Sequence, residues 1–194
     1  SAANGGEVLI AAGYPTQAAI FIKEALENKI YDKFLFVDGT KSEDLIAAVG
    51  ADALDGQKGT APGAGPETPA LKAWNDAYKA KNGDLPALPF VREAYDATIC
   101  LALASASAGS VAGADIAAAL PQVCGGDGEK AIPGAAGVKA ALDLASDGKA
   151  VNFEGAATSL DWNDKGDITN GYIDIWQYKD GGIATLDSKP VDLN

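Results

Sequence analysis

The sequence contains no histidine and no methionine, and only two of its 194 residues are cysteine. Without histidine the chain cannot form a Ser-His-Asp or Cys-His catalytic site, a zinc site with histidine ligands, or an imidazole general base. No G-x-G-x-x-G follows the first predicted strand, and the P-loop and G-x-S-x-G motifs are absent as well. These absences argue against the commonest enzyme chemistries of α/β proteins.

Basic residues are scarce, since 15 Lys and Arg stand against 27 Asp and Glu, which gives a formal net charge of −12. This charge argues against nucleic acid and anionic membrane surfaces as partners, because both bind basic patches. No apolar run approaches the roughly 20 residues that span a bilayer. Hydrophobic residues still make up 47% of the chain and aromatic residues only 7%, which is typical of an ordered, helix-rich protein.

The chain lacks a starting methionine, and its first six residues lead directly into a predicted strand without a signal peptide. We therefore expect a processed or cut product. Upstream strands of the same sheet are expected to be missing from it.

Two short apolar runs, Val8–Ala12 and Phe34–Val37, flank a segment with helical character, Thr16–Asn28. Neither run alternates between apolar and polar residues, so each suits a strand that is buried on both faces of a parallel sheet. Together the three segments predict a βαβ unit.

Each of these predicted strands ends in a small polar cluster, one containing Tyr14 and the other Asp38. Ligands of open parallel sheets bind beyond the carboxyl ends of the strands, so we expect Tyr14 and Asp38 side by side at a ligand-binding edge. The alternatives are structural: Tyr14 would start a helix with its ring on the sheet edge, and Asp38 would form a turn before Gly39.

The remaining sequence predicts helices in the middle of the chain and strands in its C-terminal part. A Pro- and Gly-rich stretch, Pro62–Pro66, is the best candidate for a crossover between lobes. Phe90–Ala108 is apolar almost all round and is expected to be the most buried helix. The expected helices are Glu43–Val49, Thr68–Asn82, Phe90–Ala108, Ala114–Leu120 and Ala135–Ser146, and the expected strands are Gly56–Pro62, Thr158–Trp162 and Tyr172–Tyr178.

Two further chemistries depend on carboxylates. Asp38, Asp44 and Glu93 would suit a carboxylate-dependent α/β enzyme if they faced a cleft. Asp161–Asp167 begins like an EF-hand calcium loop, but a lysine and a tyrosine stand at the fifth and twelfth positions. A turn between two strands explains this segment better, and we expect no metal site.

The two cysteines, Cys100 and Cys124, are 24 positions apart. An even number of cysteines in a helix-rich acidic protein fits a disulfide formed in an oxidising compartment. The alternative is a pair of buried small hydrophobic residues, and two cysteines alone leave both open.

Six motifs, taken in their order along the chain, closely resemble the second half of branched-chain amino-acid-binding proteins. They are Ala12-Gly13-Tyr14-Pro15, Phe36-Val37-Asp38-Gly39, Gly59-Thr60-Ala61-Pro62, Ala73-Trp74-Asn75-Asp76-Ala77-Tyr78-Lys79, Glu93-Ala94-Tyr95-Asp96-Ala97 and Leu160-Asp161-Trp162-Asn163-Asp164-Lys165-Gly166-Asp167. These proteins are the extracytoplasmic solute receptors of ABC importers, with the type I periplasmic binding fold. The resemblance covers nearly the whole chain.

The resemblance implies an α/β fold made of parts of two Rossmann-like lobes, with parallel sheets and flanking helices. Residues 1–62 would belong to the second lobe, 63–172 to the C-terminal part of the first lobe, and 173–194 would return to the second. The insertion over residues 125–151 is longer than in the simplest members. Family members are nearly twice as long as this chain, so the resemblance implies a missing N-terminal half.

The resemblance also implies a function and a site. The protein would bind an amino acid or a related small polar solute between two lobes that close on it, and deliver it to an ABC permease, without cofactor or catalysis. Tyr14 and Phe90 match aromatic ligand contacts, and Asp38 stands where relatives carry a carboxylate, commonly glutamate, for the ligand ammonium. A periplasmic location favours the Cys100–Cys124 disulfide.

Two alternatives stay open at this stage. The same fold serves as a small-molecule sensing domain in receptors and regulators. A small α/β enzyme that uses Asp38 and Tyr14 belongs to a different class, and turnover of a bound metabolite would favour it.

Overall fold

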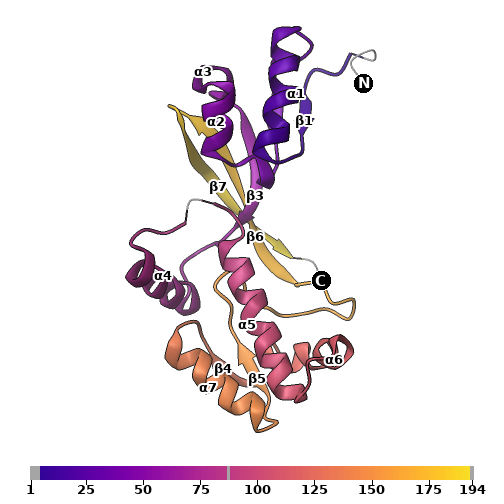
Figure 1. The fold of residues 1–194 in the computed structure, drawn as a ribbon, viewed down its shortest axis with the longest axis vertical. Helices are drawn as coiled ribbons and strands as arrows, with labels where there is room; N and C mark the ends of the chain where they lie inside the picture. The colour runs from indigo at the N-terminus through magenta and orange to yellow at the C-terminus, as the bar shows by residue number, and fades with distance from the viewer. Residues whose placement is uncertain (1–4, 87, 193–194) are drawn as a thin grey trace. The chain divides into compact units, whose positions relative to one another are not determined.

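The computed structural model describes residues 5–86 and 88–192, which divide into two compact units. One unit holds residues 5–63 with Ile173–Lys189, and the other holds Ala64–Tyr172 with residues 190–192. Figure 1 labels most of their helices and strands. The assignment of residues 1–62, 63–172 and 173–194 to the lobes of a larger receptor stays a prediction.

The first unit is built on one sheet with the strand order β1-β2-β3-β6-β7. Its elements are β1 (Leu9–Ala11), α1 (Pro15–Glu27), β2 (Phe34–Phe36), the 3₁₀ helix η2 (Asp38–Thr40), α2 (Glu43–Val49), α3 (Ala51–Leu54), β3 (Lys58–Gly63) and most of β6 (Asn170–Lys179) and β7 (Gly182–Asp192). β1, β2 and β3 run parallel, with Phe36 opposite both Ala11 and Gly59. β6 runs antiparallel to β3, since Tyr178 bonds Gln57 whereas Asp174 lies against Gly63.

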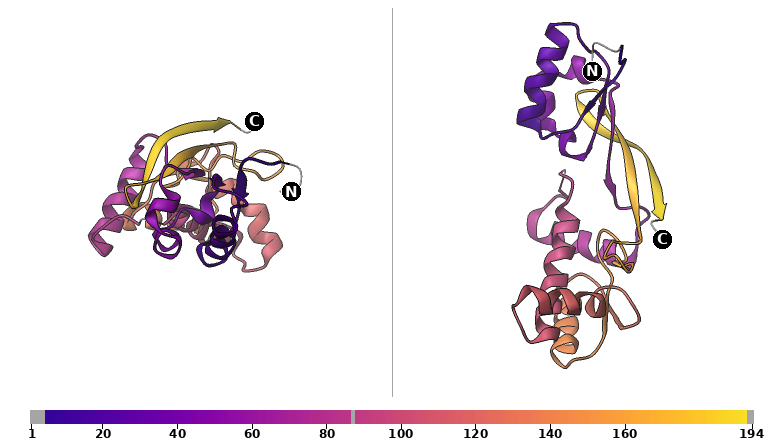
Figure 2. Two further views of the ribbon diagram at one scale, coloured as in Figure 1. Left: turned by 90° about the horizontal axis from the view of Figure 1, so that it is seen from above. Right: turned by 90° about the vertical axis from the view of Figure 1, so that its right-hand side faces the viewer.

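The predicted βαβ unit is confirmed, and local sequence explains its helix. Pro15 occupies the first turn of α1, where a missing N–H does no harm and the fixed φ suits a helix. Helices α1 and α2 lie on one side of β1, β2 and β3 (Figure 2). Phe34 and Phe36 are buried there, whereas Ile10 is 66% exposed and Leu35 is 43% exposed. Among the described residues these strands are therefore covered on one face, not on both as the sequence pattern predicted.

The second unit is mainly helical. Its elements are α4 (Pro69–Asn82), α5 (Val91–Ala108), α6 (Gly113–Val123), β4 (Glu129–Ala131), α7 (Ala135–Ser146) and β5 (Val151–Phe153). β4 and β5 form a two-stranded parallel sheet in which Glu129 lies opposite Val151. The core of this unit includes Leu103, Val123 and Phe153, each fully buried.

Several sequence-based expectations for the second unit need correction. α5 begins at Val91 rather than Phe90, and Leu101 on its outer face is 51% exposed, so α5 is buried along one stripe only. Pro121 lies inside α6 instead of ending it. Thr158–Trp162 forms no strand apart from a single bridge between Trp162 and Ile168, because Leu160 has a positive φ of 63°, which interrupts an extended backbone, and its N–H bonds the Thr158 hydroxyl at 3.1 Å.

Within the described residues, no single helix is long and apolar enough to cross a membrane. Among these residues only α5 and α6 together are long and apolar enough, and this pair is bent by 106° at the break between the two helices.

Candidate ligand site

The first predicted site residue, Tyr14, lies where β1 gives way to α1. Its backbone is extended, with φ of −108° and ψ of 162°, and its carbonyl accepts the Ala18 N–H at 2.9 Å to start the helix. The Tyr14 side chain makes no capping bond and is 70% exposed. An exposed aromatic ring at the carboxyl end of a parallel strand is free to contact a ligand.

The second predicted residue, Asp38, opens the 3₁₀ turn that follows β2. Thr40 closes this turn, because its hydroxyl donates to the Val37 carbonyl at 2.6 Å and its N–H bonds the same carbonyl at 3.1 Å. The Lys41 N–H bonds the Asp38 carbonyl at 3.0 Å. One carboxylate oxygen of Asp38, Oδ1, accepts the Gly39 N–H at 2.6 Å, so the side chain is held by the turn that it begins.

The structure brings Tyr14 and Asp38 together. A Cβ atom placed on Gly39 would lie 2.5 Å from the Gly13 carbonyl oxygen and 3.3 Å from Cδ1 of Tyr14, so the turns after β1 and β2 are in direct contact. Only glycine allows this approach. The contact follows from the parallel register of β1 and β2, which aligns the carboxyl ends of both strands at one edge of the sheet.

The third predicted residue, Phe90, belongs to the other unit, where it precedes α5. Phe90 has φ of 71° and ψ of 0°, a left-handed conformation that is strained for a bulky side chain, and the residue is 39% exposed. Trp74, Leu85 and Val91 line a small cavity of about 120 Å³ with it. Strained backbone of this kind is concentrated at ligand-contacting positions, which is consistent with the predicted role.

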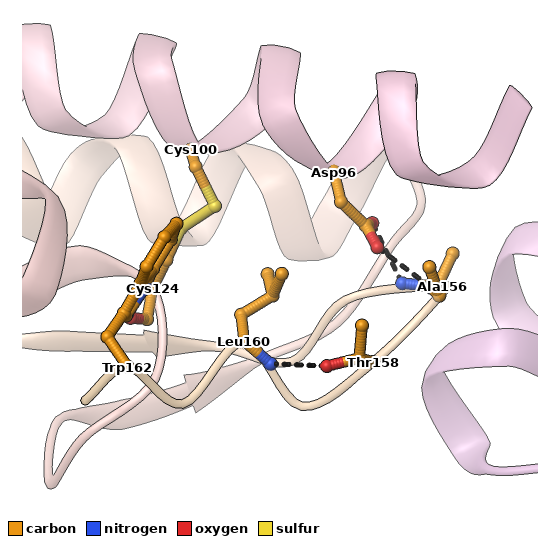
Figure 3. The surroundings of a disulfide bond; sticks show 8 residues. Asp96, Cys100, Cys124, Ala156, Thr158, Leu160 and Trp162 are labelled. Atoms are coloured by element: carbon orange, nitrogen blue, oxygen red, sulfur yellow. Dashed lines mark hydrogen bonds between the residues drawn. A yellow bond between two sulfur atoms is a disulfide. The ribbon is translucent and has the colours of Figure 1, made fainter. Parts of the chain in front are cut away.

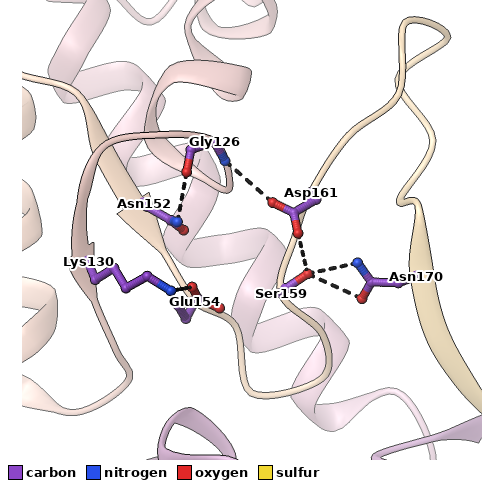
Figure 4. Close-up of polar contacts among 7 residues, drawn as sticks. All are labelled: Gly126, Lys130, Asn152, Glu154, Ser159, Asp161 and Asn170. Carbon is purple, nitrogen blue, oxygen red and sulfur yellow. Dashed lines mark hydrogen bonds and ion pairs between the residues drawn. The ribbon is translucent and has the colours of Figure 1, made fainter. Parts of the chain in front are cut away.

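A larger cavity of about 480 Å³ lies wholly within the second unit, and sequence analysis missed it. Its wall combines apolar groups with an ion pair in which Lys130 Nζ lies 2.6 Å from Glu154 Oε1. Figure 4 shows this pair beside the polar chain from Asn170 through Ser159 to Asp161. The lining residues are Ala64, Pro66, Thr68–Ala70, Lys130, Ile132, Glu154–Ser159 and Asn170–Tyr172. They come from four segments that are far apart in the sequence, so no local sequence pattern could identify them as neighbours.

The disulfide between Cys100 and Cys124 is present and joins α5 to the end of α6, with 5.9 Å between the two Cα atoms. The Trp162 indole N–H donates to the Cys124 carbonyl at 3.0 Å, which attaches the segment after β5 to the same point (Figure 3). The expected pairing of Cys100 with Cys124 is confirmed.

One turn of α5 before Cys100, the carboxylate of Asp96 accepts the backbone N–H groups of Ala156 and Ala157, both at 2.8 Å (Figure 3). Asp96 is 2% exposed. Burial raises its pKa to about 6, although the two N–H donors act in the opposite direction. Nearby, Glu93 raises this pKa further and Arg92 lowers it. Asp96 thus holds part of the cavity wall, a role that its sequence position did not indicate.

The raised pKa of Asp96 predicts a stability that falls as pH rises. The folded protein holds this proton up to about pH 6, whereas the unfolded chain releases it near pH 4, so the contribution is full below pH 4 and is lost as pH passes 6. We expect the free energy of unfolding to be higher at pH 5 than at pH 7.5, and Asp96 should contribute about 1.4 kcal/mol of this difference, out of about 3 kcal/mol over its whole titration. Urea denaturation at both pH values measures the difference.

Asp96→Asn should reduce this pH dependence, because it removes the titrating group. Asp84→Asn is the matched control, since Asp84 is exposed and the variant makes the same change of charge. Equal pH dependence in the Asp96 variant and the control would contradict the assignment.

The described residues contain no group of three or more carboxylate, cysteine or histidine side chains arranged to hold a metal ion. The EF-hand-like segment is a turn, in which Asn163 Oδ1 accepts the N–H groups of Lys165 and Asp167 at 2.9 and 3.0 Å. Its side chains therefore support the backbone, as the turn interpretation predicted.

The chain is 25% identical, over 173 residues, to the leucine-, isoleucine-, valine-, threonine- and alanine-binding protein of Pseudomonas aeruginosa, a match that covers 89% of this chain and 38% of that protein. It is 30% identical, over 129 residues, to the chemotactic signal transduction system substrate-binding protein BasB of Halobacterium salinarum, covering 58% of this chain and 30% of that protein. No protein-family model matches.

Among solved structures, the leucine-binding protein LivK of Thermotoga maritima superposes with a TM-score of 0.62 at 22% sequence identity, covering 93% of this chain and 44% of that one. The chain has the type I periplasmic binding fold. It is similar to branched-chain amino-acid-binding proteins and matches them over only part of their length, which is consistent with a C-terminal half. The chain spans less than half the length of these relatives, which are named as binding proteins.

Proposed function

We propose that this chain is the C-terminal half of an extracytoplasmic solute-binding protein that serves an ABC importer. The complete protein binds an amino acid or a related small polar solute and releases it unchanged. The observation that carries this proposal is the contact between the turns of Tyr14 and Asp38, at the carboxyl ends of two parallel strands. Relatives named for binding leucine, isoleucine and valine support the class of ligand.

Each site residue has a distinct role in this proposal. The Asp38 carboxylate pairs with the ammonium group of the solute, because an ammonium withdrawn from water needs an anionic partner. Tyr14 and Phe90 pack against its apolar part, which suits their partly exposed rings. Nothing in this arrangement breaks or forms a covalent bond.

Calorimetric titration of the complete protein with a panel of L-amino acids tests the proposal. We expect tight, saturable binding of at least one aliphatic amino acid, followed by its recovery in chemically unchanged form. Conversion of the recovered compound would favour the carboxylate-dependent enzyme instead, and failure of every amino acid to bind would contradict the ligand class.

The missing N-terminal half is the partner that this proposal requires within the same protein. β1 lies at one end of the strand order, and the side chains of Val8 and Ile10 beside that edge are 49% and 66% exposed. An apolar strand edge of this kind is normally paired or covered, because it otherwise recruits another chain. Relatives more than twice as long have further chain with which to cover it.

We therefore expect the isolated 194-residue chain to associate, and light scattering at increasing concentration measures this. Ile10→Lys should shift the chain toward monomer, because a charge at an edge strand disfavours pairing. Ile20→Lys is the matched control, since Ile20 is 67% exposed but lies on α1. A monomeric wild-type chain at high concentration would contradict the expectation.

A further inference from the structure

The strand that connects the two units also touches the turn that holds Asp38. β6 begins in the second unit at Asn170 and ends in the first unit at Lys179. Near its end, the Tyr178 hydroxyl donates a hydrogen bond to the Thr40 carbonyl across 138 positions of sequence. Thr40 is the last residue of the 3₁₀ turn that Asp38 begins.

This contact is buried and well supported. Tyr178 is 1% exposed and Thr40 is fully buried. The Tyr178 ring meets the Phe36 ring edge to face at 5.3 Å between centroids, and Phe36 ends β2, two residues before Asp38. Tyr178 therefore supports the turn at both ends, through Phe36 at its start and Thr40 at its finish.

The backbone of Tyr178 is fixed independently of its hydroxyl. The Tyr178 N–H bonds the Gln57 carbonyl at 3.0 Å, and the Tyr178 carbonyl accepts the Gly56 N–H at 2.9 Å. The hydroxyl is thus presented from a rigid strand. Burial raises its pKa to about 12, with the Ser42 backbone N–H acting in the opposite direction, so the hydroxyl stays protonated and able to donate at any physiological pH.

We propose that Tyr178 is a positioning residue for the ligand site, which holds the Asp38 turn in its binding geometry from the strand that connects the two units. Removal of the hydroxyl leaves the Thr40 carbonyl buried without this donor, and the turn then relaxes. Solute affinity falls because Asp38 is no longer held where the ammonium needs it. The loss of affinity depends on the proposed function, whereas the loss of order in the turn does not.

The test uses Tyr178→Phe in the complete protein with two measurements, amide hydrogen exchange of Thr40 and Lys41 without ligand, and calorimetric titration with L-leucine. We expect exchange at these two amides to accelerate about tenfold and the Kd for L-leucine to rise about tenfold, the range for one lost buried hydrogen bond. Tyr31→Phe is the matched control, because Tyr31 is a partly buried tyrosine of the same unit, and it should change neither quantity.

Replacement of Tyr178 by para-aminophenylalanine retains an N–H donor and should restore both values toward those of the wild type. It also keeps the proposal testable if Tyr178→Phe does not fold. Unchanged exchange of Thr40 and Lys41 in Tyr178→Phe would overturn the positioning role. Accelerated exchange with an unchanged Kd would show that the order of the turn does not affect ligand binding, and would overturn that part of the proposal. A wild-type protein that binds no amino acid would overturn the proposed ligand class alone, and exchange would then decide the positioning role.

Discussion

Asp38→Asn is expected to weaken solute binding by about 2–4 kcal/mol, or roughly 30- to 1,000-fold in Kd. Asparagine retains the size of the side chain and an oxygen that can accept the Gly39 N–H, so the turn should persist. The change removes the charge that pairs with the ligand ammonium, and an ammonium left without an anion in a desolvated site is strongly disfavoured. Calorimetry of the complete protein with the amino acid that binds the wild type measures the loss.

Two comparisons make this result specific. Asp32→Asn changes an exposed carboxylate of the same unit and should leave affinity unchanged. Tyr14→Ala should weaken binding less than Asp38→Asn does, because it removes apolar contact rather than a charge partner. Unchanged affinity in Asp38→Asn would reject ammonium recognition and indicate a neutral amide or an acidic solute.

Loss of the Cys100–Cys124 disulfide is expected to lower the free energy of unfolding by about 3 kcal/mol. The bridge closes a loop between residues 24 positions apart, and it restricts the unfolded chain more than the folded one. The double variant Cys100→Ala/Cys124→Ala should therefore unfold at a lower urea concentration. Because both sulfur atoms are buried in the core of the second unit, a smaller loss of packing adds to this effect.

Reduction of the wild-type protein provides the control for this prediction. A reductant should lower the stability of the wild type toward that of the double variant and should leave the variant unaffected. Equal stability of the oxidised and reduced wild type would show that the bridge contributes nothing. The turns that contain Tyr14 and Asp38 lie in the first unit and both cysteines in the second, so urea unfolding rather than ligand binding is the appropriate measurement.

Local signals in the sequence located most of the helices correctly. Ser42 caps α2 by accepting the Asp44 N–H at 3.1 Å, and Gly50 ends that helix with a positive φ of 105°, which favours glycine, as the residue types predicted. Thr68 caps α4 in the same way, through the Leu71 N–H. These predictions succeeded because capping depends on residues only two or three positions apart.

The candidate site was predictable in part for a similar reason. A βαβ unit forces its two strands to run parallel, so the residues after β1 and β2 had to meet at one edge of the sheet. Tyr14 and Asp38 were therefore placed together from the pattern alone, and the contact at Gly39 gives the detail. That Tyr14, Asp38 and Phe90 contact a ligand stays a prediction.

The sequence by itself determined the βαβ unit, the helix caps, the family resemblance and the exclusion of histidine chemistry, because each depends on neighbouring residues or on composition. Only the tertiary structure decided which distant groups meet. Asp96 bonds Ala156 across 60 positions, and Tyr178 bonds Thr40 across 138, at separations where no local pattern pairs one residue with another. Such contacts form because a buried polar group without a hydrogen bond costs free energy. Which group becomes its partner depends on how the whole chain packs.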